Sequence, residues 1–280
     1  MLGGLVFMID WVAFNDVFIR LIFFFSIFAL IVIWEIFRPR KDLNESKSIR
    51  WISNLSLVAL NSLIVRILLP VTSIGVAVLA HTEQWGLLNL IELPDWLTVI
   101  IAVALMDFAI YLQHLLMHAS PILWRLHQVH HADLDVDVTT GLRFHPLEIL
   151  ISMVFKFVVI AALGVPVVAV VIFEVLLNAS SMFNHGNIFI TSKMDRVLRH
   201  VLVTPDMHRL HHSVNPRWMN RNFGFCLTWW DRIFGTYLTQ SFDVHDDIKL
   251  GLKAEDQSKT SIRLIGMLLM PFKKANERSL

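Results

Sequence analysis

The residues of this sequence that could form a chemically active site are its clustered histidines. Eleven of the thirteen histidines lie between positions 114 and 212. They form an HxxxH pair, an HxxHH triplet and, in the segment PDMHRLHHS, a second HxxHH triplet. In order, the candidate residues are His114 and His118, then His127, His130 and His131, then His145 in RFHP, His185 in FNHGN, and finally His208, His211 and His212.

Helical geometry makes these spacings suitable for metal binding. Side chains three and four residues apart share one helix face, so HxxxH offers two imidazoles to one point and HxxHH offers three. Neutral imidazole suits zinc, copper, iron and nickel, whereas magnesium and calcium prefer oxygen ligands. The clusters therefore predict a site for a first-row transition metal.

The number of histidines exceeds what one metal needs, because a catalytic zinc ion uses about three protein ligands. Two metals would use the clusters, each taking roughly four or five imidazoles if all of them point inward. The alternative is a set of surface or core histidines with no common target. Single histidines would favour that alternative, but three clusters at ligand spacing favour metal.

The elements that position these residues must lie in a membrane. The chain is 55% hydrophobic and only 17% charged, its mean hydropathy is +0.60, and several apolar runs are long enough to cross a bilayer. The net charge of +1 says nothing about nucleic acid, but the sequence has no basic patch interleaved with aromatics, so we expect no nucleic-acid partner. Cys226 is the only cysteine, which excludes an intramolecular disulfide and favours a small buried residue.

Apolar runs and loop charges predict the topology. We expect a first span over 17–34 that is not removed as a signal peptide, followed by a cytoplasmic basic loop over 38–50. One long kinked span over 51–80 then leads to an outer acidic loop over 81–95. A third span over 96–118 returns to the cytoplasm, and 147–182 forms two spans or a re-entrant hairpin. This order places every clustered histidine at the cytoplasmic membrane edge. It leaves the exposed-loop residue His81 a poor ligand candidate.

The sequence thus predicts an all-α fold, a polytopic membrane bundle of about four to five spans or with a re-entrant hairpin, under a cytosolic histidine-rich helical cap. We expect three parts: N-terminal transmembrane helices over 1–95, a catalytic domain over 96–240, and a cytosolic or interfacial tail over 241–280. Within that tail, SIRLIGMLLMPFKK is apolar but short and favours an interfacial helix.

Charged residues near the histidines leave some roles open. Asp107 lies inside a predicted span, where it would either hydrogen-bond a ligand imidazole or satisfy an interhelical contact. Asp133, Asp135 and Asp137 alternate with other residues and favour a solvated acidic loop. Arg66 would face the bundle interior or reach toward the interface. The rings of Trp218, Trp229 and Trp230 would lie at the lipid interface or pack within the cap.

The order HxxxH, HxxHH, FHP, NHGN and HxxHH, followed by WWDRIFGTY, resembles the fatty acid hydroxylase and sterol desaturase family of membrane di-iron enzymes, over residues 100–240. By this resemblance, His114 and His118 match the family's first box, and the two triplets match its second and third boxes. His185 matches the histidine of its HxGN segment and His145 that of its HP segment. The resemblance implies a four-helix-like membrane bundle, two irons bound by histidines alone, and oxygen-dependent attack on a lipid C–H bond.

Iron suits such chemistry because it can supply electrons to dioxygen, which zinc cannot. We expect hydroxylation of a lipid, or its desaturation, since both begin with hydrogen abstraction. No HPGG haem motif occurs, so electrons would come from a separate donor of the cytochrome b5 or ferredoxin type with its reductase. Neither haem nor flavin is expected in this chain, and no proton-transfer residue can be assigned beyond the metal ligands.

Other classes of histidine-rich membrane protein fit the pattern less well. A zinc or copper transporter would place its ligands along a path near mid-membrane, whereas these gather at one edge. A haem cytochrome needs axial ligands on opposite faces of the iron, which adjacent His-His pairs supply poorly. A zinc hydrolase is less well supported, because the HExxH motif of such enzymes does not occur in this sequence.

Overall fold

The computed structural model describes residues 2–239, 248–253 and 261–273, with side chains from residue 15 onward. In this part of the chain the fold is all helical, and only isolated β-bridges occur beside the helices. The longer helices are α1 (Leu2–Phe37), α2 (Lys47–Leu68), α3 (Ser73–Thr82), α4 (Asp95–Ala119), α5 (Pro121–His131), α6 (Pro146–Leu163) and α7 (Val167–His185). The shorter ones are η1 (Leu87–Leu90), η2 (Thr140–Leu142), α8 (Ser192–Leu198), α9 (Pro205–His211), α10 (Pro216–Met219), α11 (Trp229–Ile233), α12 (Leu264–Leu269) and η4 (Met270–Phe272).

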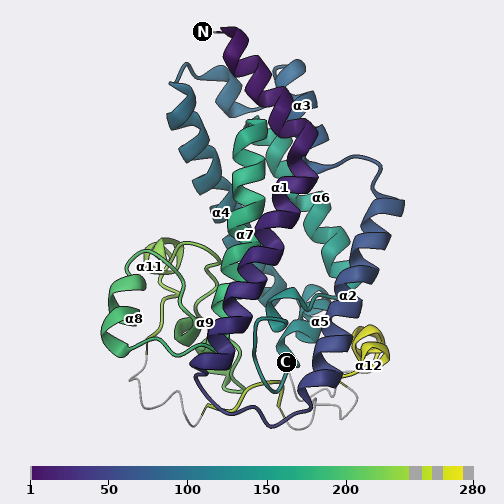
Figure 1. The fold of residues 1–280 in the computed structure, drawn as a ribbon, viewed down its shortest axis with the longest axis vertical. Helices are drawn as coiled ribbons and strands as arrows, with labels where there is room; N and C mark the ends of the chain where they lie inside the picture. Colours follow the sequence, from purple (N-terminus) through teal and green to yellow (C-terminus); the bar gives the residue numbers. More distant parts are fainter. Residues whose placement is uncertain (1, 240–247, 254–260, 274–280) are drawn as a thin grey trace.

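Five segments of the described chain are long and apolar enough to cross a bilayer, which confirms a multi-pass membrane protein. They are Asn15–Phe37, Lys47–Leu90, Asp95–Ala119, Pro146–Leu163 and Val167–His185. Figure 1 shows α1, α4, α6 and α7 running along the long axis of the molecule, with α5, α8, α9 and α11 gathered at one end as a cap.

The apolar run over 51–80 lies within one candidate span, Lys47–Leu90, as predicted, and its kink is a break between two helices, α2 and α3. Pro70 disfavours helical backbone at the residue before it, and Leu69 is extended with φ −114° and ψ 95°. Thr72 then caps α3, its hydroxyl accepting from the Gly75 N–H at 3.1 Å. Arg66, near the end of α2, is exposed on the outside of the bundle.

A tight connection joins α6 to α7, so the apolar run over 147–182 is two helices, each long enough to span. Gly164 ends α6 in the left-handed conformation with φ +67°, which favours glycine, and a Cβ there would meet Trp85 O at 2.5 Å. Pro166 follows at the position directly before α7. This turn sends α7 back toward the cap, where it ends at His185.

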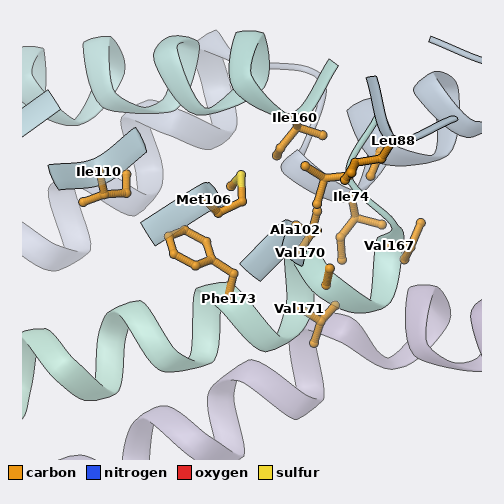
Figure 2. Packing of buried hydrophobic residues seen from close by; sticks show 13 residues of the cluster. Ile74, Leu88, Ala102, Met106, Ile110, Ile160, Val167, Val170, Val171 and Phe173 are labelled. Atoms are coloured by element: carbon orange, nitrogen blue, oxygen red, sulfur yellow. The ribbon is translucent and has the colours of Figure 1, made fainter. Parts of the chain in front are cut away.

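The apolar core of the bundle lies at the end away from the histidines. It is formed by side chains from α3, η1, α4, α6 and α7, and Figure 2 shows Met106 of α4 beside Phe173 of α7 within it. Ala102 and Phe173 are fully buried, and their packing fixes α4 against α7. Both helices then carry histidines at their other ends.

At the same end lies α12, which has Met267 buried while Ile265 and Leu269 are exposed, and its interfacial position stays a prediction. Of the expected tail over 241–280, residues 241–247, 254–260 and 274–280 lie outside the described residues. Trp218 packs within the cap, Trp230 is partly buried with its ring 4.9 Å from that of Phe108 on α4, and Trp229 is exposed.

Candidate metal centre

Nine of the ten predicted histidines meet in two adjacent groups where α4, α5, α7 and α9 converge. Within each group, one ring nitrogen from every member lies within 4.8 Å of the others. The five-histidine group contains His114, His118, His127, His131 and His211, and the four-histidine group contains His130, His185, His208 and His212.

Each HxxHH triplet divides between the two groups, which corrects the expectation that all three of its imidazoles meet at one point. His127 and His131, four residues apart on α5, join the five-histidine group, while His130 turns to the other. In the second triplet the assignment is reversed: the pair four residues apart is in the four-histidine group and His211 is in the five-histidine group. A spacing of four aligns two side chains, and the residue between them is rotated toward the neighbouring site.

Local sequence places these helices. Pro121 and Pro205 occupy the first turns of α5 and α9, where a missing N–H costs nothing. The Thr204 side chain caps α9. Gly141 in η2 lets that turn approach α7 closely: a Cβ at this position would lie 2.5 Å from Ser181 O and 3.1 Å from His185 Nδ1. His185 is therefore packed between η2 and the second triplet.

Hydrogen bonds orient five of the rings, because Nδ1 of each faces an acceptor. His114 faces Phe223 O at 2.8 Å, His130 faces Arg143 O at 3.2 Å, His185 faces Ser181 O at 2.6 Å, His211 faces Arg221 O at 2.8 Å, and His127 faces Glu148 Oε1 at 2.6 Å. A neutral imidazole that donates from Nδ1 keeps its lone pair on Nε2. The Nε2 atoms are thus the available ligands.

These Nε2 atoms approach one another as ligands of a common ion would. Nε2 of His185 lies 3.0 Å from Nε2 of His130, of His208 and of His212. With a metal–nitrogen bond of about 2.1 Å, neighbouring ligands at right angles are about 3.0 Å apart. His130 and His185 donate from Nδ1, so their Nε2 atoms, 3.0 Å apart, both carry lone pairs that repel each other unless a cation lies between them.

Burial keeps the histidines outside the spans neutral. Desolvation, reinforced by neighbouring imidazoles, lowers the pKa of His130, His131, His208 and His212 well below the ordinary value and lowers the pKa of His211 to about 3. Among the described residues, Nε2 of His127 and both ring nitrogens of His131 are buried without a hydrogen-bond partner. Buried polar atoms without partners are costly, and a metal ion would satisfy the ring nitrogen of each imidazole that carries the lone pair.

The structure does not bring His145 to either group, which corrects its assignment from the HP segment. Its ring caps α6, with Nδ1 accepting from the Leu147 N–H at 3.2 Å and Nε2 facing Leu268 O at 3.3 Å. A histidine directly before a proline at a helix start is explained by capping alone.

Asp107 contacts backbone and an indole rather than an imidazole, which decides between its two predicted roles. Its carboxylate accepts from the N–H groups of Cys226 and Leu227, each at 3.1 Å, and from Trp230 Nε1 at 2.9 Å. These bonds hold the segment after the second triplet against α4. The carbonyl of Phe223 in that segment orients His114, so Asp107 acts on the metal site indirectly. Cys226 is buried, as predicted.

The expected solvated acidic loop is instead a buried ion network, so that prediction is wrong. Arg50 of α2, fully buried, donates to Asp133 at 2.8 and 2.9 Å and to Asp137 at 2.8 Å. Asp135 accepts from the N–H groups of Asn44 and Glu45. Burial alone would raise the pKa of Asp133, but Arg50 and Arg143 outweigh it and lower that pKa. The network ties α2 to the loop directly after the first triplet.

Glu148 was missed by sequence reasoning, because the hydrogen bond that joins it to His127 depends on how α5 and α6 pack. We expect Glu148→Ala to lower metal affinity about 10- to 100-fold, the range for losing a carboxylate that orients a ligand imidazole. Glu148→Gln keeps an oxygen that can accept from His127 Nδ1 and should lose less. Metal content after dialysis against a graded chelator measures both variants. Equal retention by Glu148→Ala and the unaltered protein would show that His127 needs no such partner.

A cavity of about 440 Å³ adjoins the five-histidine group and extends into the bundle. His114 and His127 line one end, with Glu148 beside them, and apolar side chains such as Ile110, Met117 and Phe225 line the wall. The cavity therefore connects the metal-binding end of the protein with the interior of the membrane-spanning helices.

Fold and site together define a multi-pass membrane protein with two adjoining all-histidine sites able to bind metal. The fatty acid hydroxylase family profile matches residues 99–236, the segment that carries all nine clustered histidines. This segment of the chain is therefore a member of the fatty acid hydroxylase family.

Curated relatives are similar over part of their length. An alkylglycerol monooxygenase from Xenopus tropicalis is 30% identical over 176 residues, which cover 59% of this chain and 36% of the relative. The human alkylglycerol monooxygenase is 29% identical over 163 residues, 55% of this chain and 34% of the relative. The ornithine lipid hydroxylase OlsE from Rhizobium tropici is 24% identical over 199 residues, 71% of this chain and 55% of the relative. The chain thus spans about a third of the monooxygenases and about half of the ornithine lipid hydroxylase. No solved structure matches the chain.

Proposed function

We propose that this protein is a membrane-bound di-iron oxygenase that hydroxylates a C–H bond of a lipid. The observation that carries the proposal is the pair of adjoining all-histidine sites, of which the five-histidine group meets a cavity that reaches into the membrane-spanning helices. The matched relatives are named as lipid hydroxylases or monooxygenases, which favours hydroxylation over desaturation.

The nine clustered histidines would hold two iron ions, one in each group. Iron in these sites would supply electrons to dioxygen, which a redox-inert zinc ion cannot do. His130, His131 and the second triplet remain neutral because they are buried, so they bind metal without first losing protons. The ordered Nδ1 contacts hold the rings in place before any metal arrives.

The cavity would bind the lipid and keep water from the reacting carbon. Ile110, Met117 and Phe225 give it an apolar wall beside His114, so a methylene placed there is desolvated. Glu148 lies on the same wall and is hydrogen-bonded to His127. This arrangement leaves one short stretch of the lipid chain close to the metal-binding end.

We further propose that the histidine groups lie at the cytoplasmic membrane edge and that a cytochrome b5 or ferredoxin type of donor, with its reductase, supplies electrons. The basic segment 38–50 supports this orientation, because its backbone contacts the metal-binding end: the Arg40 N–H donates to Asn187 O at 3.0 Å, two residues after His185. Each turnover needs external electrons, since one oxygen atom enters the lipid and the other leaves as water.

A zinc or copper transporter receives less support. In the described residues the ligand groups gather at one end of the bundle, and the five-histidine group opens on a single cavity. A transport path needs ligands or polar groups at successive depths between both membrane faces.

The test compares lipids from cells that express the chain, a His185→Ala variant or neither, grown under isotopic dioxygen. We expect one lipid class to gain a labelled oxygen atom only with the unaltered chain, and the purified protein to contain about two irons without a Soret band. Loss of hydrogen without label would indicate desaturation. An unchanged lipid profile together with bound zinc, or a haem spectrum, would refute the proposal.

A further inference from the structure

A network of charged residues lines the cavity at the end remote from the histidines: Glu174 is buried, and Arg20 and Lys156 are partly buried. Arg20 of α1 donates to Glu174 of α7 at 2.5 Å and is also paired with Asp16. Lys156 of α6 donates to the same Glu174 at 2.8 Å. Arg20, Lys156 and Glu174 all line the cavity. Charges within membrane-spanning helices are expensive and commonly mark a binding or transport function.

The network lies well away from the metal-binding end. Glu148, hydrogen-bonded to His127, and Lys156 are both on α6 and both line the cavity. They are eight residues apart, which is about 12 Å along a helix. Between them the walls include apolar side chains from α1, α2 and α7, among them Phe24, Val58 and Leu177. The cavity therefore has two polar ends joined by a mainly apolar passage.

Donors remain available at the remote end. Glu174 is the one acceptor that the Lys156 ammonium meets among the described residues, so two of its three N–H donors are left for a ligand or water. The Glu174 carboxylate is already engaged, because it also accepts from the Ser73 hydroxyl at 2.7 Å and from Arg20. A group that binds here must consequently offer acceptor oxygens.

Charge balance restricts that group further. Arg20 and Lys156 carry two positive charges, which Asp16 and Glu174 neutralise. An anionic phosphate or carboxylate would leave an uncompensated charge inside the membrane-spanning region, which is costly. Uncharged hydroxyl, ester or amide oxygens would satisfy Lys156 without this cost.

We propose that the Arg20–Glu174–Lys156 network binds the uncharged, oxygen-bearing polar group of an amphiphilic lipid whose chain extends along the cavity toward His114. This inference rests on the proposed function for the identity of the ligand as substrate. The distance between the two ends would then determine which carbon reaches the metal-binding end, several bonds away from the polar group. Lys156 acts here as a binding residue for the polar group.

The first test measures binding of three radiolabelled probes, 1-palmitoylglycerol, palmitate and hexadecane, to purified detergent-solubilised protein. The unaltered protein should prefer 1-palmitoylglycerol. Lys156→Met should weaken that probe about 10- to 100-fold, as expected for losing hydrogen bonds to a charged group, and leave hexadecane unchanged. Arg66→Met removes a positive charge from the exposed side of α2 and is the matched control.

A structural role for the network would lower binding of all three probes together with metal content and melting temperature. Tighter binding of palmitate than of 1-palmitoylglycerol, or equal binding of 1-palmitoylglycerol by Lys156→Met and the unaltered protein, would overturn the proposal.

The second test uses the unaltered protein, so it does not depend on a variant that folds. A palmitoylglycerol with a photoreactive diazirine on its glycerol should label peptides containing Phe24 or Lys156. Labelling of peptides containing Met117 or Phe144 instead would place the polar group at the metal-binding end and overturn the proposal. If oxygen-labelled lipid still forms in that case, the proposed hydroxylase function stands, whereas absence of both metal and product would refute that function alone.

Discussion

Replacing His185 by alanine is expected to empty the four-histidine group and to lower activity by more than about 100-fold, beyond the cost of losing a residue that only orients a ligand. Nε2 of His185 lies 3.0 Å from Nε2 of three other histidines, so this ring is the common neighbour of its group. Its removal leaves only three ligands in the group, His130, His208 and His212. We expect these three to bind iron too weakly to retain it against a chelator.

Metal analysis of the purified variant separates the two groups. Because His185 belongs to one group only, iron should fall from about two to about one ion per chain. His131→Ala should cause the complementary loss from the five-histidine group. Retention of two irons and full activity by His185→Ala would contradict the assignment of that group.

Two further histidines serve as controls. His81 is exposed on α3, and His145 is buried but caps α6 outside both groups. Alanine at His81 should change neither metal content nor activity, and alanine at His145 should lower stability while the iron content stays at that of the unaltered protein. Iron loss on His145→Ala with the fold intact would return this residue to the ligand set.

Local spacing predicted the parts of the site that depend on one helix. HxxxH and HxxHH fix which rings share a face, and the apolar runs fix which helices cross the bilayer, so the clusters, the spans and their gathering at one end followed from the sequence. The division of each triplet between two groups did not follow, because it depends on how α5 and α9 pack against α4 and α7. Helix packing is set by contacts between segments far apart in the chain.

Polar residues outside the clusters were the least predictable. We predicted a solvated loop at Asp133, Asp135 and Asp137, because alternating carboxylates are usually exposed. All three are buried in the structure. Their partner Arg50 lies more than 80 residues earlier, at the start of a span, where the positive-inside rule explained its charge without requiring a contact. The one sequence signal for this contact was a positively charged residue directly followed by an apolar helix.

Arg50→Met is expected to destabilise the protein by about 3–5 kcal/mol, the cost of removing one partner from a buried ion network. Arg50 is fully buried and also contacts the Asp135 carbonyl, so methionine fills much of its volume but leaves Asp133 and Asp137 with fewer donors. Arg143 remains near Asp133, at 3.5 Å, and Trp51 near Asp137, which limits the loss. Thermal unfolding in detergent should show a clear decrease in melting temperature.

The order of variants distinguishes the network from simple loss of charge. Arg50→Lys keeps the charge but cannot supply the forked donors that reach Asp133 and Asp137 together, so its melting temperature should lie between those of Arg50→Met and the unaltered protein. Lys47→Met, one turn earlier on α2, removes an exposed charge that stacks on Trp51 and should cost no more than about 1 kcal/mol. Because Asp133 follows His131 by two residues, loosening this network should also hasten iron release from the five-histidine group. Unchanged unfolding and unchanged iron release in Arg50→Met would mean that the contacts of α5 with α4, α6 and η4 hold it in place without this network.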